Sequence, residues 1–171
     1  APTVSLASSS SSIAENSGST ITLTATLSEP AGAAMTVSFL TSGAATEGSD
    51  YSTIPNITIA AGSTTGTASF TISDDAIYEG NEAAVVTISS ISDAEFIKSG
   101  NDRVSITITD NESAPTISLA SSSASIAENS GSTITLTATL SQIADEAVTV
   151  SFSTSGAAAE GSDYSAIPNI T

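Results

Sequence analysis

The chain repeats itself, and this repeat limits what it can fold into more than any other feature. Residues 1–58 align without a gap onto residues 114–171, and 48 of the 58 aligned positions are identical. The repeating unit is therefore 113 residues long, which is the size of an independent small domain and too long for one turn of a solenoid. The sequence predicts a tandem array, with a complete repeat at 1–113 and the N-terminal half of a second at 114–171.

Within the repeat, apolar residues recur at every second position. In residues 20–27, Thr alternates with Ile, Leu and Ala, a period that is typical of a strand with one buried and one solvated face. Similar runs, separated by turn signals, predict strands at 3–14 (broken at 8–12), 19–28, 35–41, 56–60, 66–73, 83–90 and 103–110. Such a series of short alternating strands predicts an all-β fold, an immunoglobulin-like antiparallel β-sandwich of about seven strands per repeat.

The composition excludes several classes of function. The chain has 18 Asp and Glu against 2 Lys and Arg, no His and no Cys, and a formal net charge of −16. Nucleic acids and anionic membrane surfaces would be repelled by this charge. The commonest general base and the usual zinc ligands are missing, so we expect no enzyme activity. No apolar run approaches the ~18 residues of a membrane span, so we expect no membrane insertion.

The acidic residues of the first repeat gather at one predicted end of the sandwich. Connections in an antiparallel sandwich alternate between its ends, which places these acids and no base at one end: Glu15, Glu47, Asp50, Asp74, Asp75, Glu79, Glu82, Asp110 and Glu112. Two carboxylates about 4 Å apart repel by about 4 kcal/mol at an effective dielectric of about 20. Ca²⁺, which binds about six to eight oxygens in tolerant geometry, is the counter-charge that fits best. A solvated, solubilising surface is the alternative interpretation.

Five short motifs follow one another along the first repeat. They are Ile13-Ala14-Glu15-Asn16, Gly48-Ser49-Asp50-Tyr51, Ala61-Gly62-Ser63, Asp74-Asp75 with Glu79-Gly80-Asn81-Glu82, and Ile108-Thr109-Asp110-Asn111-Glu112. In this order they resemble the Calx-beta domain, a family widespread in extracellular repeat proteins that include large bacterial adhesins. The resemblance implies calcium ligands at Glu15, Asp50, Asp74, Asp75, Glu79, Glu82 and Asp110, with a backbone carbonyl near Ile77.

Three more acids complete the predicted calcium ligands. Glu112 closes the same acidic end, and Glu128 and Asp163 of the second copy stand at the positions of Glu15 and Asp50. Asn111 departs from the all-acid terminus of calcium-binding family members. This departure favours fewer ions per repeat than the family's full set.

The resemblance and the charge pattern together predict a structural function. We expect a calcium-binding repeat in the rigid stalk or filament of a large secreted adhesin, extracellular at the cell surface and bacterial. Its expected partners are neighbouring repeats of the same chain, with other copies or surface-anchoring proteins as further candidates. The alternatives are a calcium-sensing regulatory module of a membrane protein and an accessory binding module beside an enzyme. Because half a sandwich leaves its core face uncovered, we also expect that the chain continues or that another chain completes the sheet.

Overall fold

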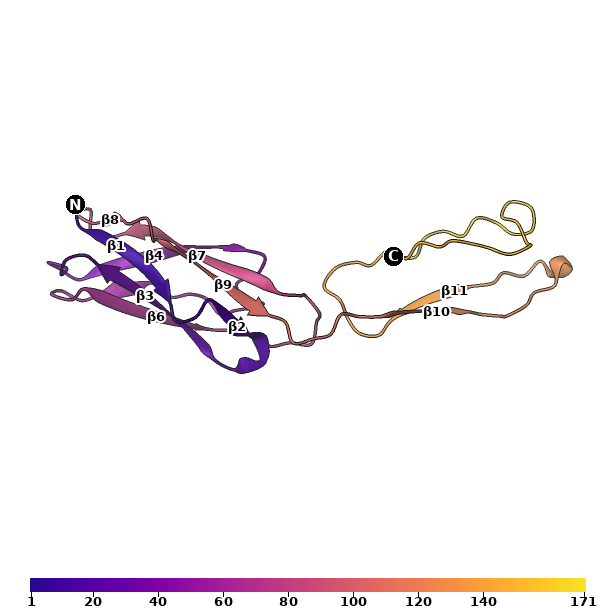
Figure 1. Cartoon of the computed structure of the whole chain (residues 1–171), viewed down its shortest axis with the longest axis horizontal. Helices are drawn as coiled ribbons and strands as arrows, with labels where there is room; N and C mark the ends of the chain where they lie inside the picture. The colour runs from indigo at the N-terminus through magenta and orange to yellow at the C-terminus, as the bar shows by residue number, and fades with distance from the viewer. The chain divides into compact units, whose positions relative to one another are not determined.

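The structure is a computed structural model that describes all 171 residues. Its internal contacts divide the chain into two units. The first unit comprises Ala1–Ala76 and Gly80–Glu112, and the second comprises Ile77–Glu79 and Ser113–Thr171. Figure 1 draws both units, whose positions relative to one another are not determined.

The first unit is a sandwich of two β-sheets. The order in one sheet is β6-β3-β1-β8, and in the other it is β2-β9-β7-β4-β5. The strands are β1 (Thr3–Ser8), β2 (Ser12–Ala14), β3 (Thr20–Leu27), β4 (Met35–Gly43), β5 (Ile57–Ile59), β6 (Thr65–Thr71), β7 (Glu82–Ile91), β8 (Ile97–Lys98) and β9 (Arg103–Thr109). The predicted all-β sandwich is confirmed, and each predicted strand corresponds to at least one observed strand.

The first predicted strand is shared between the two sheets. β1 pairs antiparallel with β3 in one sheet, whereas β2 pairs in parallel with β9 in the other. The change of sheet occurs at Ser9–Ser11, inside the predicted break. β8, which pairs in parallel with the start of β1, is not among the predicted strands. A two-residue strand is too short to produce a recognisable alternation of apolar and polar residues.

The core lies between the two sheets and follows the predicted alternation. Along β3 the apolar side chains of Ile21, Leu23, Ala25 and Leu27 are buried, while the intervening Thr residues are exposed or half-buried. Apolar side chains of the facing sheet complete this core: Met35, Val37, Ile57, Ala84, Val86, Ile88, Ile106 and Ile108. The apolar period of two therefore places one face of each strand inward.

The second unit repeats the local pairing of the first. Its strands are β10 (Ile117–Ser121) and β11 (Leu136–Leu140), which form a two-stranded antiparallel sheet. The pair Ile117 and Leu140 stands at the register of Val4 and Leu27. A further bridge joins Val150 to Ile170, at the positions where Val37 and Ile57 pair in the first unit. No helix in the structure has both the length and the apolar character needed to cross a membrane.

Candidate metal centre

A buried glutamate lies at the end of the first unit where β9 finishes. β2 ends at Ala14, and Glu15 begins the single 3-10 turn η1 (Glu15–Ser17), which Gly18 closes with φ of 61°. Glu15 is 6% exposed and is the one charged residue in the buried core. Its Oε1 accepts a hydrogen bond of 3.0 Å from the backbone N–H of Asp75. The chain therefore holds a carboxylate in an environment that normally excludes unpaired charge.

The surroundings of Glu15 favour its neutral form. Burial is the main cause that raises the pKa of Glu15. The hydrogen bond from Asp75 opposes this rise, but the negative charges of Asp75, Asp110 and Asp74 reinforce it. A cation at this position would reverse the balance, because an opposite charge favours the ionised carboxylate.

Asp110 directly follows β9 and is held by backbone donors. Its Oδ2 accepts a hydrogen bond of 2.5 Å from the N–H of Gly80, and its Oδ1 accepts one of 2.7 Å from the N–H of Glu112. The N–H of Asp110 donates in turn to Oδ1 of Asn81 at 3.2 Å. These bonds fasten the chain leaving β9 to the start of β7. Gly80 and Asn81 belong to one of the motifs of the sequence, but the motif alone does not indicate that they hold Asp110.

Glu112 carries the least satisfied polar atom of the site. Its Oε1 accepts a hydrogen bond of 2.7 Å from Nδ2 of Asn111, whereas its Oε2 is buried and has no hydrogen-bond partner. Burial is again the first cause that raises the pKa of Glu112, and the neighbouring carboxylates of Asp110 and Glu15 add to it. A buried oxygen without a donor is unfavourable in a folded protein, and a bound cation would supply the partner that this atom lacks.

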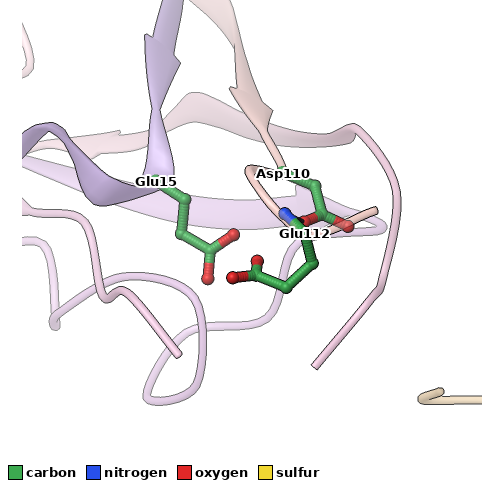
Figure 2. Close-up of side chains that lie close together, drawn as sticks. All are labelled: Glu15, Asp110 and Glu112. Carbon is green, nitrogen blue, oxygen red and sulfur yellow. Dashed lines mark hydrogen bonds between the residues drawn. The ribbon is translucent and has the colours of Figure 1, made fainter. Parts of the chain in front are cut away.

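These three side chains form the acidic cluster, defined here as Glu15, Asp110 and Glu112. One carboxylate oxygen from each lies within 4.8 Å of the others. In Figure 2 the carboxylates of Glu15 and Glu112 point toward one another, and Asp110 lies beside Glu112. Because Ca²⁺ binds oxygens at about 2.3 to 2.6 Å, two oxygens on one ion lie at most about 5 Å apart. The spacing and the all-oxygen donor set therefore fit a calcium ion.

Other predicted ligands of the first unit lie near the cluster or form a separate pair. A carboxylate oxygen of Asp75 lies within 4.8 Å of one of Glu15, and Asp74 is close enough to raise the pKa of Glu15. Asp50 and Glu82 bring carboxylate oxygens within 4.8 Å of each other. The remaining two predicted positions, Ile77 and Glu79, fall in the short segment that groups with the second unit.

The two predicted ligands of the second copy do not lie in a group of acidic side chains. Glu128 and Asp163 are both exposed, and neither belongs to a group of three possible metal ligands. Their local geometry is nevertheless that of the first copy. Glu128 begins the 3-10 turn η2 (Glu128–Ser130), and Asp163 accepts from the N–H of Ala159 at 2.7 Å, as Asp50 accepts from that of Thr46. The second copy has the turns of a site without its other carboxylates.

Two protein families match the chain. The model of the LapA domain matches residues 1–111, and that of the Calx-beta domain matches residues 110–170. Both are families of binding or structural domains rather than of enzymes. No curated protein sequence matches the chain. Because residues 1–58 and 114–171 are identical at 48 of 58 aligned positions, the two family models match copies of one repeat.

Solved structures of Calx calcium-binding domains have a similar fold. The apo form of the Calx CBD1 domain matches with a TM-score of 0.53 and 15% identity, over 63% of this chain and 97% of that one. CBD12 of CALX1.2 matches with a TM-score of 0.52 and 15% identity, over 62% of this chain and 44% of that one. The calcium-binding domain CBD12 of CALX1.1 gives 0.51 and 17%, over 58% and 40%.

The family match and the structural match agree on the same sandwich. The resemblance to Calx-beta that the motifs predicted is confirmed by the match over residues 110–170 and by the Calx structures. The LapA match covers the larger part of the sequence, including every residue of the first unit's sheets. The chain belongs to the LapA domain family, and its second copy carries the Calx-beta pattern.

Proposed function

We propose that this chain is a calcium-binding structural repeat in the stalk of a large secreted adhesin at the cell surface. The observation that carries the proposal is the acidic cluster. It combines a buried glutamate, Glu15, with a buried and unpartnered oxygen of Glu112, in a place where the chain supplies acids and no base. The match to the LapA domain supports the adhesin context.

In this proposal Glu15, Asp110 and Glu112 hold one calcium ion, with Asp75 as a further ligand. Ca²⁺ suits this set better than Mg²⁺, because it accepts more oxygens and less regular geometry. When bound, the ion supplies the positive charge that the cluster lacks, and Oε2 of Glu112 gains a partner. The pair of Asp50 and Glu82 is the candidate for a second ion.

The proposed ion ties together three segments that are distant in sequence. Glu15 follows β2, Asp75 follows β6, and Asp110 and Glu112 follow β9. A ligand that binds only the folded state stabilises it, by about 2.7 kcal/mol when its concentration is 100 times Kd. Because Asp110 and Glu112 are where the chain leaves the first sandwich, the ion also fixes the direction of this exit. If the chain leaves each sandwich in a fixed direction, consecutive repeats of a stalk bend less freely against one another.

The test is calcium binding by the intact chain and by two glutamate variants. Calorimetric titration is expected to show binding that Glu112→Gln weakens at least about tenfold, since the variant removes the charge beside Glu15 and Asp110. Glu29→Gln is the control, because Glu29 is an exposed acid outside the cluster. Equal binding by both variants would contradict the proposed ligands. Scattering measurements with calcium and with chelator test the stalk: an unchanged particle shape and flexibility would contradict stiffening.

A further inference from the structure

Three triplets of the chain have the form Asn-X-Ser or Asn-X-Thr, in which X is not Pro. They are Asn56-Ile57-Thr58, Asn111-Glu112-Ser113 and Asn169-Ile170-Thr171. A triplet of this form is the acceptor for N-linked glycosylation. Because a chain rich in Ser and Thr contains such triplets by chance, the triplet alone does not assign a site. The structure distinguishes them, because it places their amide groups in different surroundings.

The triplet at Asn56 presents both of its recognised side chains to solvent. Asn56 directly precedes β5, which is the last strand of its sheet. Side chains alternate between the two faces of an extended chain, and here Asn56 and Thr58 are exposed whereas Ile57 between them is 0% exposed. The amide of Asn56 takes part in no hydrogen bond. The amide and the hydroxyl of this triplet are therefore both available on the solvent side of a core residue.

The backbone of this triplet is held firmly from the opposite side. Ile57 pairs with Val37 of β4, and Thr58 pairs with Thr36. β6 also approaches closely, because a Cβ at Gly66 would lie 2.7 Å from Cγ2 of Ile57. The buried side chain of Ile57 thus fixes which way its two neighbours face. A sugar attached to Asn56 would extend into solvent, so the packing of the sandwich would not have to change to accommodate it.

The triplet at Asn111 is in a different position. Nδ2 of Asn111, the atom that would carry the sugar, donates a hydrogen bond of 2.7 Å to Oε1 of Glu112. Glu112 is both the middle residue of this triplet and a member of the acidic cluster, with its Oε2 buried. A sugar on Asn111 would therefore lie against the acidic cluster at the point where the chain leaves β9. The structure thus favours Asn56 over Asn111 as the acceptor.

We propose that Asn56 carries an N-linked sugar, that its counterpart Asn169 carries another, and that Asn111 is left unmodified. Asn169 is exposed, and the residue after it pairs with the counterpart of β4 as in the first copy. The attachment sites then recur every 113 residues. The proposal is independent of calcium binding, because Asn56 and Asn169 are not among the proposed ligands.

The modification is a transfer from a diphosphate-activated sugar, carried by a nucleotide or by a lipid. Nδ2 of the asparagine forms a bond to C1 of the sugar, and the bond between C1 and the diphosphate breaks. The diphosphate leaves with the electron pair of that bond, and the amide nitrogen gives up one of its two protons. A transferase of the producing cell has to bind the triplet, so the exposed hydroxyl of Thr58 belongs to the acceptor as much as Asn56 does.

The test is mass spectrometry of the protein isolated from the cells that produce it. Cleavage after Glu gives one fragment, 48–79, that contains Asn56 and another, 96–112, that contains Asn111. We expect the mass of a sugar on fragment 48–79, located on Asn56 by fragmentation, and none on fragment 96–112. An added mass of one monosaccharide indicates the nucleotide-linked donor, whereas that of an assembled oligosaccharide indicates the lipid-linked donor.

Variants made in the same cells separate recognition of the triplet from mere exposure. Thr58→Val removes the hydroxyl and keeps a β-branched side chain suited to a strand, so the sugar on Asn56 is expected to be lost. Thr58→Ser keeps the hydroxyl and is expected to keep the sugar. Asn111→Gln is the matched control and is expected to leave the sugar on Asn56 unchanged. Thermal unfolding of each variant checks that the sandwich has formed.

Three results would overturn the proposal. The first is an unmodified fragment 48–79 in the protein from its own cells. The second is a sugar on Asn111 in place of Asn56. The third is a folded Thr58→Val variant that still carries the sugar, which would show that the triplet is not what the transferase recognises. None of these results would affect the proposed calcium ligands, and loss of calcium binding would leave the expected sugar on Asn56 in place.

Discussion

Residues 1–58 and 114–171 are almost the same sequence in two different environments. Both copies form the same antiparallel ladder, in the same register, and close the same 3-10 turn with a glycine at φ of 61° and 62°. Leu6 is 5% exposed in the first copy, and its counterpart Leu119 is 55% exposed in the second. Local pairing is thus specified by the segment itself, whereas the burial of the first copy comes from the cover that residues 59–113 provide.

The metal centre also differs between the two copies. Glu15 and Glu128 begin identical turns, yet only Glu15 is buried and surrounded by other carboxylates. Asp75, Asp110 and Glu112 all come from the covering part of the first repeat. A turn sequence can therefore position one ligand, but a site needs the completed sandwich.

The largest effect on stability is expected when one leucine side chain between the sheets is shortened to alanine in each copy. Leu23→Ala leaves a cavity between the sheets and should lower the free energy of unfolding of the first unit by about 2–5 kcal/mol. Leu136→Ala removes the same atoms from a half-exposed position and should cost less than about 1 kcal/mol. Denaturant unfolding of the two variants measures both values. Similar losses would show that the second copy is covered in solution.

The second-largest difference between the two copies is expected when the first glutamate of each turn is neutralised. Glu15→Gln removes a proposed calcium ligand, so the stabilisation by calcium, about 2.7 kcal/mol at 100 times Kd, should be largely lost. Glu128→Gln should leave the calcium effect intact, because Glu128 is exposed and outside any acidic group. Thermal unfolding with calcium and with chelator gives the comparison. If Glu128→Gln abolished the effect, the site would lie elsewhere.

A smaller effect is expected from the glycine that ends each turn. Gly18 and Gly131 have positive φ, and a Cβ at either would meet no atom within 4 Å. The cost of alanine is therefore conformational, about 1 kcal/mol. Gly18→Ala should destabilise the first unit by that amount and weaken calcium binding, because it disturbs the turn that places Glu15. Gly131→Ala should change neither the first unit's unfolding nor its calcium affinity.

The smallest effect concerns pH in the absence of calcium. The pKa of Glu15 is raised above its ordinary value of 4.5, mainly by burial, so between 4.5 and the raised value the folded state holds a proton that the unfolded chain has released. The contribution of Glu15 to stability is therefore greatest at low pH and is lost as the pH rises through the raised pKa. Unfolding measured against pH should show this slope in the wild-type chain. The slope should be shallower in Glu15→Gln. In the wild-type chain saturating calcium should reverse the contribution of Glu15 to the slope, because a cation favours the ionised carboxylate.

The sequence predicted the parts of this molecule that depend on neighbouring residues. The alternation in residues 20–27 located β3, and the serine run located the break between β1 and β2. β8 was missed because it depends on a distant partner at Thr3 and Val4. Two further features could not be predicted from the sequence: the unpartnered oxygen of Glu112 and the backbone donor at Gly80. Both depend on how the chain folds back after β9.

The division of the first strand between two sheets has a mechanical consequence. β2 and β9 are parallel neighbours, with Ser12, Ile13 and Ala14 beside Thr107, Ile108 and Thr109. A force that pulls the start and the finish of the first unit apart draws β2 toward its N-terminus and β9 toward its C-terminus. The two strands are then loaded in shear, so their hydrogen bonds must fail together rather than one after another. Tension between the two ends of the first unit therefore loads this short parallel pair, in addition to the ladder of β1 with β3.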